Sequence, residues 1–315
     1  MNMALPLQFV LLVIGFIMLV KGADWFVEGA AGIADRFGIP QLVIGLTIVA
    51  MGTSAPEAAI SITSALKGNA GITIGNVVGS NILNVLLILG ITSLIVSLQV
   101  QKSTFQAEIP FVVAISVLLL VLGVNGNSLN RLDGAILVIV FCLFLCYLFW
   151  MAKKGKEQDE VPVDKKRKVW QLILFTIIGL VLIVWGSDVT VDSASAIAKF
   201  FGMSDRLIGL TIVAFGTSLP ELITSVTAGL KGKADLAIGN IVGSNTFNIL
   251  FVGGITALIT PVAFESKFIV DTLVATAAVV LLWICVCNKE KKMKRPGGVV
   301  MLLGYAAYFV YLLQS

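Results

Sequence analysis

Apolar segments that are each long enough to cross a bilayer follow one another along nearly the whole chain. Hydrophobic residues make up 58% of the 315 positions and charged residues only 13%, and a helix of about 20 apolar residues spans the hydrocarbon core of a membrane. We therefore predict an all-α, polytopic membrane protein with ten transmembrane helices. The expected spans are residues 7–30, 42–66, 72–98, 107–124, 132–151, 170–197, 207–230, 236–260, 268–287 and 298–313.

Little polar sequence is left over for a soluble domain. The longest polar stretch, residues 152–169, is predicted to be a basic linker that is too short to build a core of its own. The chain contains no histidine, which makes a zinc site or a histidine proton relay hard to build. We expect no cofactor and no transition metal.

The lysines and arginines indicate how the chain is oriented. If residues 152–169 lie inside, the inside loops carry 16 of these residues and the outside loops five, although the net charge is only +4. Because positive residues gather in cytoplasmic loops, we predict a cytoplasmic-membrane protein with both termini outside and the 152–169 loop inside. This sorting by side accounts for the basic charge without a nucleic-acid partner.

An internal repeat relates the two halves of the chain at an offset of 164 residues. The offset takes KGNAGITIGNVVGSNILN at 67–84 to KGKADLAIGNIVGSNTFN at 231–248. We divide the chain into a first five-helix repeat (1–151), the linker, and a second five-helix repeat (170–315). Because five is odd, the second repeat enters the membrane from the opposite face. Such inverted repeats are typical of secondary transporters, which bind their substrate near the membrane midplane.

Each repeat carries a polar motif in the middle of its second span, TIVAMGTSAPE at 47–57 and TIVAFGTSLPE at 211–221. Proline interrupts the hydrogen-bond ladder of a helix, so we expect both spans to break, at Pro56 and Pro220. In lipid the groups released by a break need new partners, and a cation would serve. The carbonyls that we expect the breaks to free are those of Ala50 and Ala214.

The side chains of these motifs are oxygen donors. Thr53 lies four residues before Glu57 and therefore on the same helix face, with Ser54 beside it. The second copy repeats this arrangement with Thr217, Ser218 and Glu221.

The third span of each repeat adds a polar stripe. Asn76, Ser80 and Asn84 are spaced by four residues and share one face of a helix. Carboxylate, carbonyl, amide and hydroxyl oxygens are the donors that calcium, magnesium and sodium prefer. Alternatively, the stripes join neighbouring helices, as polar residues do in membranes. The equivalent stripe in the second repeat is Asn240, Ser244 and Asn248.

Two acids in the membrane interior favour a bound cation. An ionised side chain at the bilayer centre costs about 2.5 to 3.5 kcal/mol on insertion scales, and neither motif contains a lysine or arginine to compensate Glu57 or Glu221. The alternative is that both acids are protonated and hydrogen-bond to the helix kinks. A second acidic group is interpreted as solvated helix ends, with a cation-attracting vestibule on each side of the membrane as the alternative. It consists of Asp24, Glu28, Asp188 and Asp192.

These motifs resemble those of the cation/calcium antiporter superfamily, the sodium/calcium exchangers and their prokaryotic relatives. The resemblance covers the whole chain, with GTSAPE and GSNILN in residues 47–84 and GTSLPE and GSNTFN in residues 211–248. It implies that Glu57 and Glu221 are central ion ligands and that the long first and sixth spans form a sliding gate. The implied further ligands are Thr53, Thr217, Ser54, Ser218, Ser80, Ser244 and the carbonyls of Ala50 and Ala214, and to these we add the stripe amides of Asn84 and Asn248.

One position departs from the family pattern. Several exchangers carry an aspartate where this chain has Asn248, and Asn84 is neutral as well. The core then holds two formal negative charges, which one divalent or two monovalent cations balance. A third sodium ion would leave a net positive site in a low-dielectric region, which argues against potassium co-transport and a three-sodium stoichiometry.

We interpret the chain as a secondary antiporter, not an enzyme, that exchanges sodium for calcium by alternating access. The nearest alternative replaces sodium with protons on the same glutamates. An intramembrane enzyme would need a nucleophile with a base, which the motifs do not offer, and the inverted halves disfavour a channel. The expected partners are Ca²⁺, Na⁺ and the lipid bilayer, and the sequence does not indicate an oligomeric state.

Overall fold

The computed structural model describes residues 5–67, 71–158, 168–202 and 214–314, and the all-α prediction is confirmed. Half of the predicted 152–169 linker, residues 159–167, falls outside these residues, whereas 152–158 continue the helix that begins at Arg131 and Val169 already begins the next helix. The first repeat contains α1 (Leu5–Phe37), α2 (Gln41–Ile44), η1 (Gly45–Val49), α3 (Ala50–Thr53), α4 (Ala55–Leu66), α5 (Gly71–Ile82), η2 (Leu83–Leu89), α6 (Gly90–Ile95), β1 (Leu98–Gln99), η3 (Thr104–Glu108), α7 (Ile109–Val124), β2 (Ser128–Leu129) and α8 (Arg131–Gln158). The second contains α9 (Val169–Phe200), α11 (Ala214–Gly216), α12 (Leu219–Leu230), α13 (Ala234–Thr246), η5 (Phe247–Val252), α14 (Gly253–Ile259), β3 (Val262–Ala263), α15 (Ser266–Cys285), β4 (Lys292–Met293) and α16 (Arg295–Gln314).

Within the described residues, seven helices are long and apolar enough to cross a membrane, and the bent pair Gln41–Thr53 and Ala55–Leu66 makes an eighth candidate span. Of the two remaining expected spans, 207–230 falls partly outside the described residues and 298–313 lies within α16. The count of ten therefore stays a prediction. The two most buried spans are Thr73–Ile95 and Ala234–Ile259, so the third helix of each repeat forms the centre of the core.

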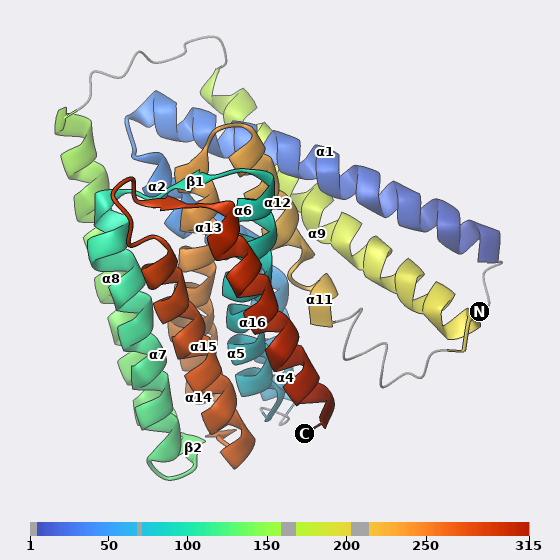
Figure 1. Ribbon diagram of the computed structural model, residues 1–315, viewed down its shortest axis with the longest axis vertical. Helices are drawn as coiled ribbons and strands as arrows, with labels where there is room; N and C mark the ends of the chain where they lie inside the picture. Colours follow the sequence, from blue (N-terminus) through green and yellow to red (C-terminus); the bar gives the residue numbers. More distant parts are fainter. Residues whose placement is uncertain (1–4, 68–70, 159–167, 203–213, 315) are drawn as a thin grey trace.

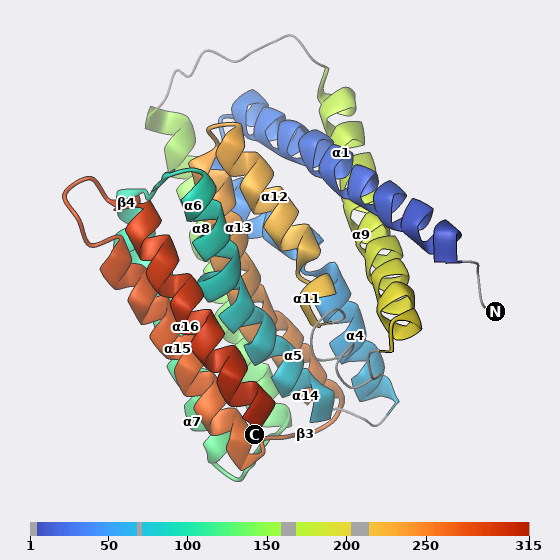
Figure 2. The same ribbon diagram turned by 45° about the vertical axis from the view of Figure 1, so that its right-hand side comes forward.

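α1 and α9 form a separate antiparallel pair, tilted against the other long helices (Figures 1 and 2). Glycines allow close approach, because a Cβ atom at Gly15 would lie 3.0 Å from the Gly186 carbonyl oxygen and one at Gly22 would lie 2.9 Å from that of Gly179. The two helices therefore run in opposite directions along their contact. The offset of 164 makes these two helices equivalent, so their antiparallel packing agrees with the inverted repeats expected from the sequence.

Two short strand pairs join the repeats. β1 pairs with β4 through Leu98↔Met293, and β2 pairs with β3 through Leu129↔Val262, both antiparallel. Each pair extends by one hydrogen bond, from Val100 N to Lys291 O at 2.8 Å and from Phe264 N to Asn127 O at 2.9 Å. The offset of 164 exchanges these two contacts, so the internal symmetry extends to the loops.

Candidate cation site

Both polar motifs interrupt their helices as the prolines predict. α3 ends at Thr53 and α4 begins at Ala55, with Pro56 in its first turn, and the two parts of this span meet at 51°. α11 ends at Gly216 and α12 begins at Leu219, with Pro220 in the same position. Because proline has no N–H group, it fits the first turn of a helix, where that group has no intrahelical partner.

The breaks place each glutamate in the first turn of a buried helix. Glu57 lies near the start of α4 and Glu221 near the start of α12, and each is only 1% exposed. The N-terminus of a helix carries partial positive charge from its unpaired N–H groups. Helix ends therefore compensate part of the carboxylate charge, a contribution that the sequence argument left out.

The two motifs meet across the repeat boundary. The Ser54 hydroxyl donates a 2.7 Å hydrogen bond to Glu221 Oε1. On the other side, Thr217 and Ser218 lie close to the Glu57 carboxylate. Each glutamate of one repeat is therefore faced by the threonine and serine of the other.

Several acceptor oxygens at this point lack a donor. In the described part of the chain, no Lys or Arg forms an ion pair with Glu57 or Glu221. A buried acceptor without a partner is costly, and a bound cation would remove that cost for all of them at once. The buried oxygens without a hydrogen-bond partner here are Glu57 Oε1 and Oε2, Glu221 Oε2, Asn84 Oδ1, Asn248 Oδ1 and Ser218 Oγ.

The polar stripes divide into two functional parts. Asn76 does not face the gap between the glutamates but donates to the Glu57 carbonyl at 3.0 Å and to Ser61 Oγ at 2.8 Å. Asn240 makes the same two contacts, to the Glu221 carbonyl at 3.3 Å and to a serine hydroxyl. These amides bind the backbone carbonyl of each glutamate. The alternative in which the polar stripes join neighbouring helices therefore describes Asn76 and Asn240.

Asn84 and Asn248 form the other part. Both are 1% exposed and lie in the π-helical segments η2 and η5. Single π-helical turns frequently mark functional sites, and here they occur at equivalent positions of both repeats. Ser80 is buried in α5, and Ser244 Oγ lies 3.4 Å from the Ala50 carbonyl oxygen.

The expectation that Pro56 frees the Ala50 carbonyl is wrong. This carbonyl accepts the Ser54 N–H at 3.0 Å and the Thr53 hydroxyl at 3.3 Å. The physical reason is that proline removes the bond to the residue four positions before it, which is Gly52. In the second repeat the Ser218 N–H donates to the Phe215 carbonyl at 3.2 Å, so the local bonding around Ala214 differs from that around Ala50.

Sequence reasoning missed two groups of residues. Ser187 of α9 donates a 2.7 Å hydrogen bond to the carbonyl of Gly216, the group that Pro220 leaves without an intrahelical partner. No sequence pattern pointed to it, because its repeat equivalent is Ala23. Asn81 and Asn245 contact each other across the core. They lie inside the GSN segments of both stripes, but their spacing placed them off the chosen face.

The second acidic group does not form one site. Asp24 pairs with Lys231 at 2.7 Å, whereas Asp188 and Asp192 are exposed on α9. Glu28 is partly buried. The exposure and the ion pair fit the interpretation as solvated carboxylates, and a cation-attracting vestibule on each side of the membrane stays an alternative prediction.

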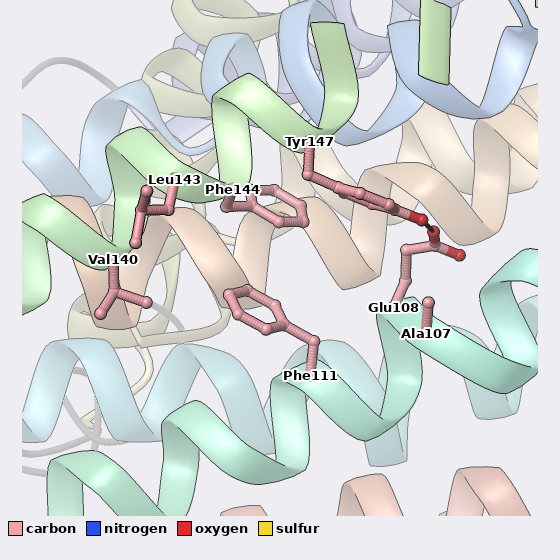
Figure 3. Close-up of a pocket in the computed structure, with 7 residues that line it drawn as sticks. All are labelled: Ala107, Glu108, Phe111, Val140, Leu143, Phe144 and Tyr147. Atoms are coloured by element: carbon pink, nitrogen blue, oxygen red, sulfur yellow. Dashed lines mark hydrogen bonds between the residues drawn. The ribbon is translucent and has the colours of Figure 1, made fainter. Parts of the chain in front are cut away.

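A second buried acid lies away from the motifs, between α7 and α8. Glu108 is 1% exposed, its Oε1 accepts a hydrogen bond from the Tyr147 hydroxyl, and its Oε2 lacks a partner. Both residues line one end of a cavity of about 280 Å³ whose other walls are mainly apolar, including Phe111 and Phe144 (Figure 3). α15 and α16 hold a similar pair, because Tyr308 donates to Asp271 at 3.0 Å.

Comparison with known proteins agrees with this geometry. Residues 7–150 and 171–314 match the family described as sodium/calcium exchanger protein. The chain belongs to the sodium/calcium exchanger family. Members are transporters, and each matched region of this family member contains one of the two motifs.

Similar proteins extend over the full length of this exchanger-family chain. The sodium/calcium exchanger MaX1 of Methanosarcina acetivorans is 30% identical, with 98% of this chain and 99% of that protein covered. The inner membrane protein YrbG of Escherichia coli (strain K12) is 34% identical, with 96% and 94% covered. The solved structure of the sodium-calcium exchanger NCX_Mj soaked with 10 mM Na⁺ and no Ca²⁺ superimposes with a TM-score of 0.85 at 33% identity, covering 98% and 99%.

Proposed function

We propose that this chain exchanges Na⁺ for Ca²⁺ across the cytoplasmic membrane, with both ions competing for Glu57 and Glu221. The observation that carries the proposal is the group of buried oxygens without donors around these two carboxylates. They are hard donors, which suit Ca²⁺ and Na⁺. Its membership of the exchanger family and the names of its relatives support the same ion pair.

The ligand set that we propose surrounds the two glutamates. Thr53, Ser54 and Ser218 are fully buried beside them, and the amide oxygens of both π-helical segments face no donor. Two negative charges match one Ca²⁺ or two Na⁺. The remaining proposed ligands are Thr217, Ser80, Ser244, Asn84, Asn248 and the carbonyls of Ala50 and Ala214.

Alternating access follows from the cost of an uncompensated site. Without cations the two carboxylates would be buried and unpaired, which opposes a change of access. The protein then changes its side of access only when cations occupy the site. This coupling enforces exchange and prevents a leak of ions down their gradients. α1 and α9, which pack mainly on each other, are the proposed moving part.

We propose the orientation that the basic residues favour, with both termini outside and the 152–169 loop in the cytoplasm. The loop from Asn288 to Lys294 and the contact between Lys231 and Asp24 then lie on the cytoplasmic side. The division into repeats at 1–151 and 170–315 belongs to the same proposal.

The test is Ca²⁺ uptake driven by a Na⁺ gradient in vesicles that contain the purified protein. Glu57→Gln and Glu221→Gln are each expected to abolish uptake. Glu290→Gln is a matched control, because a hydrogen bond from Lys294 and its charge lower the pKa of this exposed carboxylate, so this variant also removes one negative charge. Uptake by E290Q should be unchanged. Full uptake by both buried-site variants would overturn the assignment of the glutamates.

The same vesicles distinguish a calcium/proton antiporter. An outward proton gradient without Na⁺ would drive Ca²⁺ movement if protons replace sodium on the glutamates. We expect no such movement, and Ca²⁺ movement that follows the pH gradient and ignores Na⁺ would replace sodium by protons as the coupling ion.

A further inference from the structure

Four asparagines form a hydrogen-bond network where the third helices of the two repeats cross. Asn81 and Asn245 are repeat equivalents, as are Asn84 and Asn248, and all four are at most 3% exposed. Two contacts run to backbone carbonyls and two to side-chain amides. They are Asn81 Nδ2 to Asn245 O at 3.3 Å, Asn245 Nδ2 to Asn81 O at 3.4 Å, Asn84 Nδ2 to Asn245 Oδ1 at 3.1 Å, and Asn248 Nδ2 to Asn81 Oδ1 at 3.3 Å.

The direction of every bond in this network follows from the two backbone carbonyls. A carbonyl oxygen only accepts, so Asn81 must turn its NH₂ group toward the Asn245 carbonyl. Its own side-chain oxygen then faces Asn248 and can only accept. Asn248 must therefore present its NH₂ group to Asn81, which turns the Asn248 Oδ1 atom the other way. The same steps, started from Asn245, fix the orientation of Asn84.

The two oxygens that are turned away have no hydrogen-bond donor. Asn84 Oδ1 and Asn248 Oδ1 are both buried without a partner. An asparagine that rotated by 180° would present NH₂ in the same place, and NH₂ repels a cation. The amide network therefore decides whether these two positions attract or repel positive ions.

We propose that Asn81 and Asn245 are positioning residues that orient the Asn248 and Asn84 amides so that their oxygens face the transported ions. The assignment rests on the proposed function, because it takes the space between the glutamates as the cation site. Neither residue needs to contact an ion. Each acts through the amide of the opposite repeat.

Replacing the oriented Asn248 amide by a carboxylate tests the assignment, because it should reverse the effect that loss of Asn81 has on ion binding. The two oxygens of an aspartate are equivalent, so aspartate at position 248 needs no partner to orient it. It would also place a negative oxygen against Asn81 Oδ1, because the Asn81 NH₂ group is held by the Asn245 carbonyl. Loss of Asn81 should thus be harmful beside Asn248 but harmless or beneficial beside an aspartate.

The experiment is a double-mutant cycle on Ca²⁺ binding by the purified full-length protein. Asn81→Leu is made in the native background and together with Asn248→Asp, and the Ca²⁺ dissociation constants are measured by titration calorimetry. N81L alone is expected to weaken binding about tenfold, which corresponds to the loss of about one hydrogen bond. In the N248D background, N81L should leave binding unchanged or strengthen it. N245L with N84D provides the same test in the other repeat if N81L does not fold.

Asn76→Leu is the matched control. Asn76 holds the Glu57 carbonyl and makes no contact with the four-asparagine network, so its loss should weaken binding equally in both backgrounds. Equal losses for N81L in both backgrounds would show a purely structural role and overturn the assignment. Unimpaired binding by N81L in the native background would overturn it as well. Absence of Ca²⁺ binding by the unsubstituted protein would instead overturn the proposed function on which it rests.

Discussion

The Ser54 hydroxyl donates a 2.7 Å hydrogen bond to the Glu221 carboxylate, although the two residues are 167 positions apart in the chain. The bond runs from the helix break of one repeat to the acid of the other. Neither repeat therefore contains the whole of the proposed site. In this proposal, ion binding and the packing of the two repeats depend on the same residues.

Ser54→Ala is expected to weaken Ca²⁺ binding more than Ser218→Ala does. The first substitution removes a hydrogen bond to a carboxylate, an interaction of about 1.5 to 3 kcal/mol, whereas Ser218 Oγ lies near Glu57 without a hydrogen bond of good geometry. We expect a loss of about tenfold or more in affinity for S54A and a smaller one for S218A. Titration of the purified variants measures both, and an equal or larger loss in S218A would contradict the asymmetry.

A disulfide between positions 191 and 216 is expected to stop transport. A Cβ atom on Gly216 would lie 3.2 Å from the Cβ atom of Val191 in α9, close to the spacing of about 3.5 to 4.5 Å in disulfides. The bond would fix α9 to the helix break beside Glu221. The measurement is Ca²⁺ flux by V191C/G216C in a background without the four native cysteines, before and after reduction.

Reduction should restore flux, and V191C alone should transport in both conditions; G216C alone is not a matched control, because its Cβ atom would clash with Val191 Cγ2. Undiminished flux in a fully cross-linked sample would show that α9 does not move relative to α11 during transport.

Tyr147→Phe is expected to destabilise the fold by about 1 to 3 kcal/mol, the cost of a buried polar group without a partner. The Tyr147 hydroxyl donates to Glu108 Oε1, and Glu108 Oε2 has no hydrogen-bond partner among the described residues. Replacing both partners by apolar residues, in Y147F/E108L, should recover most of the loss. Thermal unfolding in detergent measures these changes.

The repeat supplies the control for this prediction. Tyr311 is the equivalent of Tyr147 and is 38% exposed, so Tyr311→Phe should leave the unfolding temperature unchanged. A loss in Y311F as large as that in Y147F would indicate a general effect of removing the hydroxyl.

Calcium binding is expected to weaken as the pH falls. A cation binds the ionised form of Glu57 and Glu221, so protons compete with it and binding releases them. The dissociation constant measured over a range of pH should rise toward acid, and E57Q and E221Q should each weaken this dependence together with the affinity, because each keeps only one of the two carboxylates. A dissociation constant that is independent of pH down to about pH 5 would contradict binding by these carboxylates.

The larger features of the fold were accessible from the sequence because they depend on hydrophobic length and on repetition. Pro56 and Pro220 broke their helices where expected, since the missing N–H group acts locally. The Ala50 carbonyl was misjudged because the N–H group that Pro56 lacks would have bonded to Gly52, while Ser54 N–H still donates to Ala50. The roles of Asn76 and Asn81 could not be predicted, because a stripe gives the helix face but not which carbonyl lies opposite.

The strand pairs β1–β4 and β2–β3 limit how this protein can change shape. Each pair connects a loop of one repeat to a loop of the other, and the two pairs lie at opposite ends of the molecule (Figures 1 and 2). If the two halves of the transporter rotated as rigid bodies, at least one of the two strand pairs would have to break in every transport cycle. Neither strand pair includes α1 or α9, so in the proposed mechanism the ions become accessible from each side through movement of these two helices along the rest of the protein.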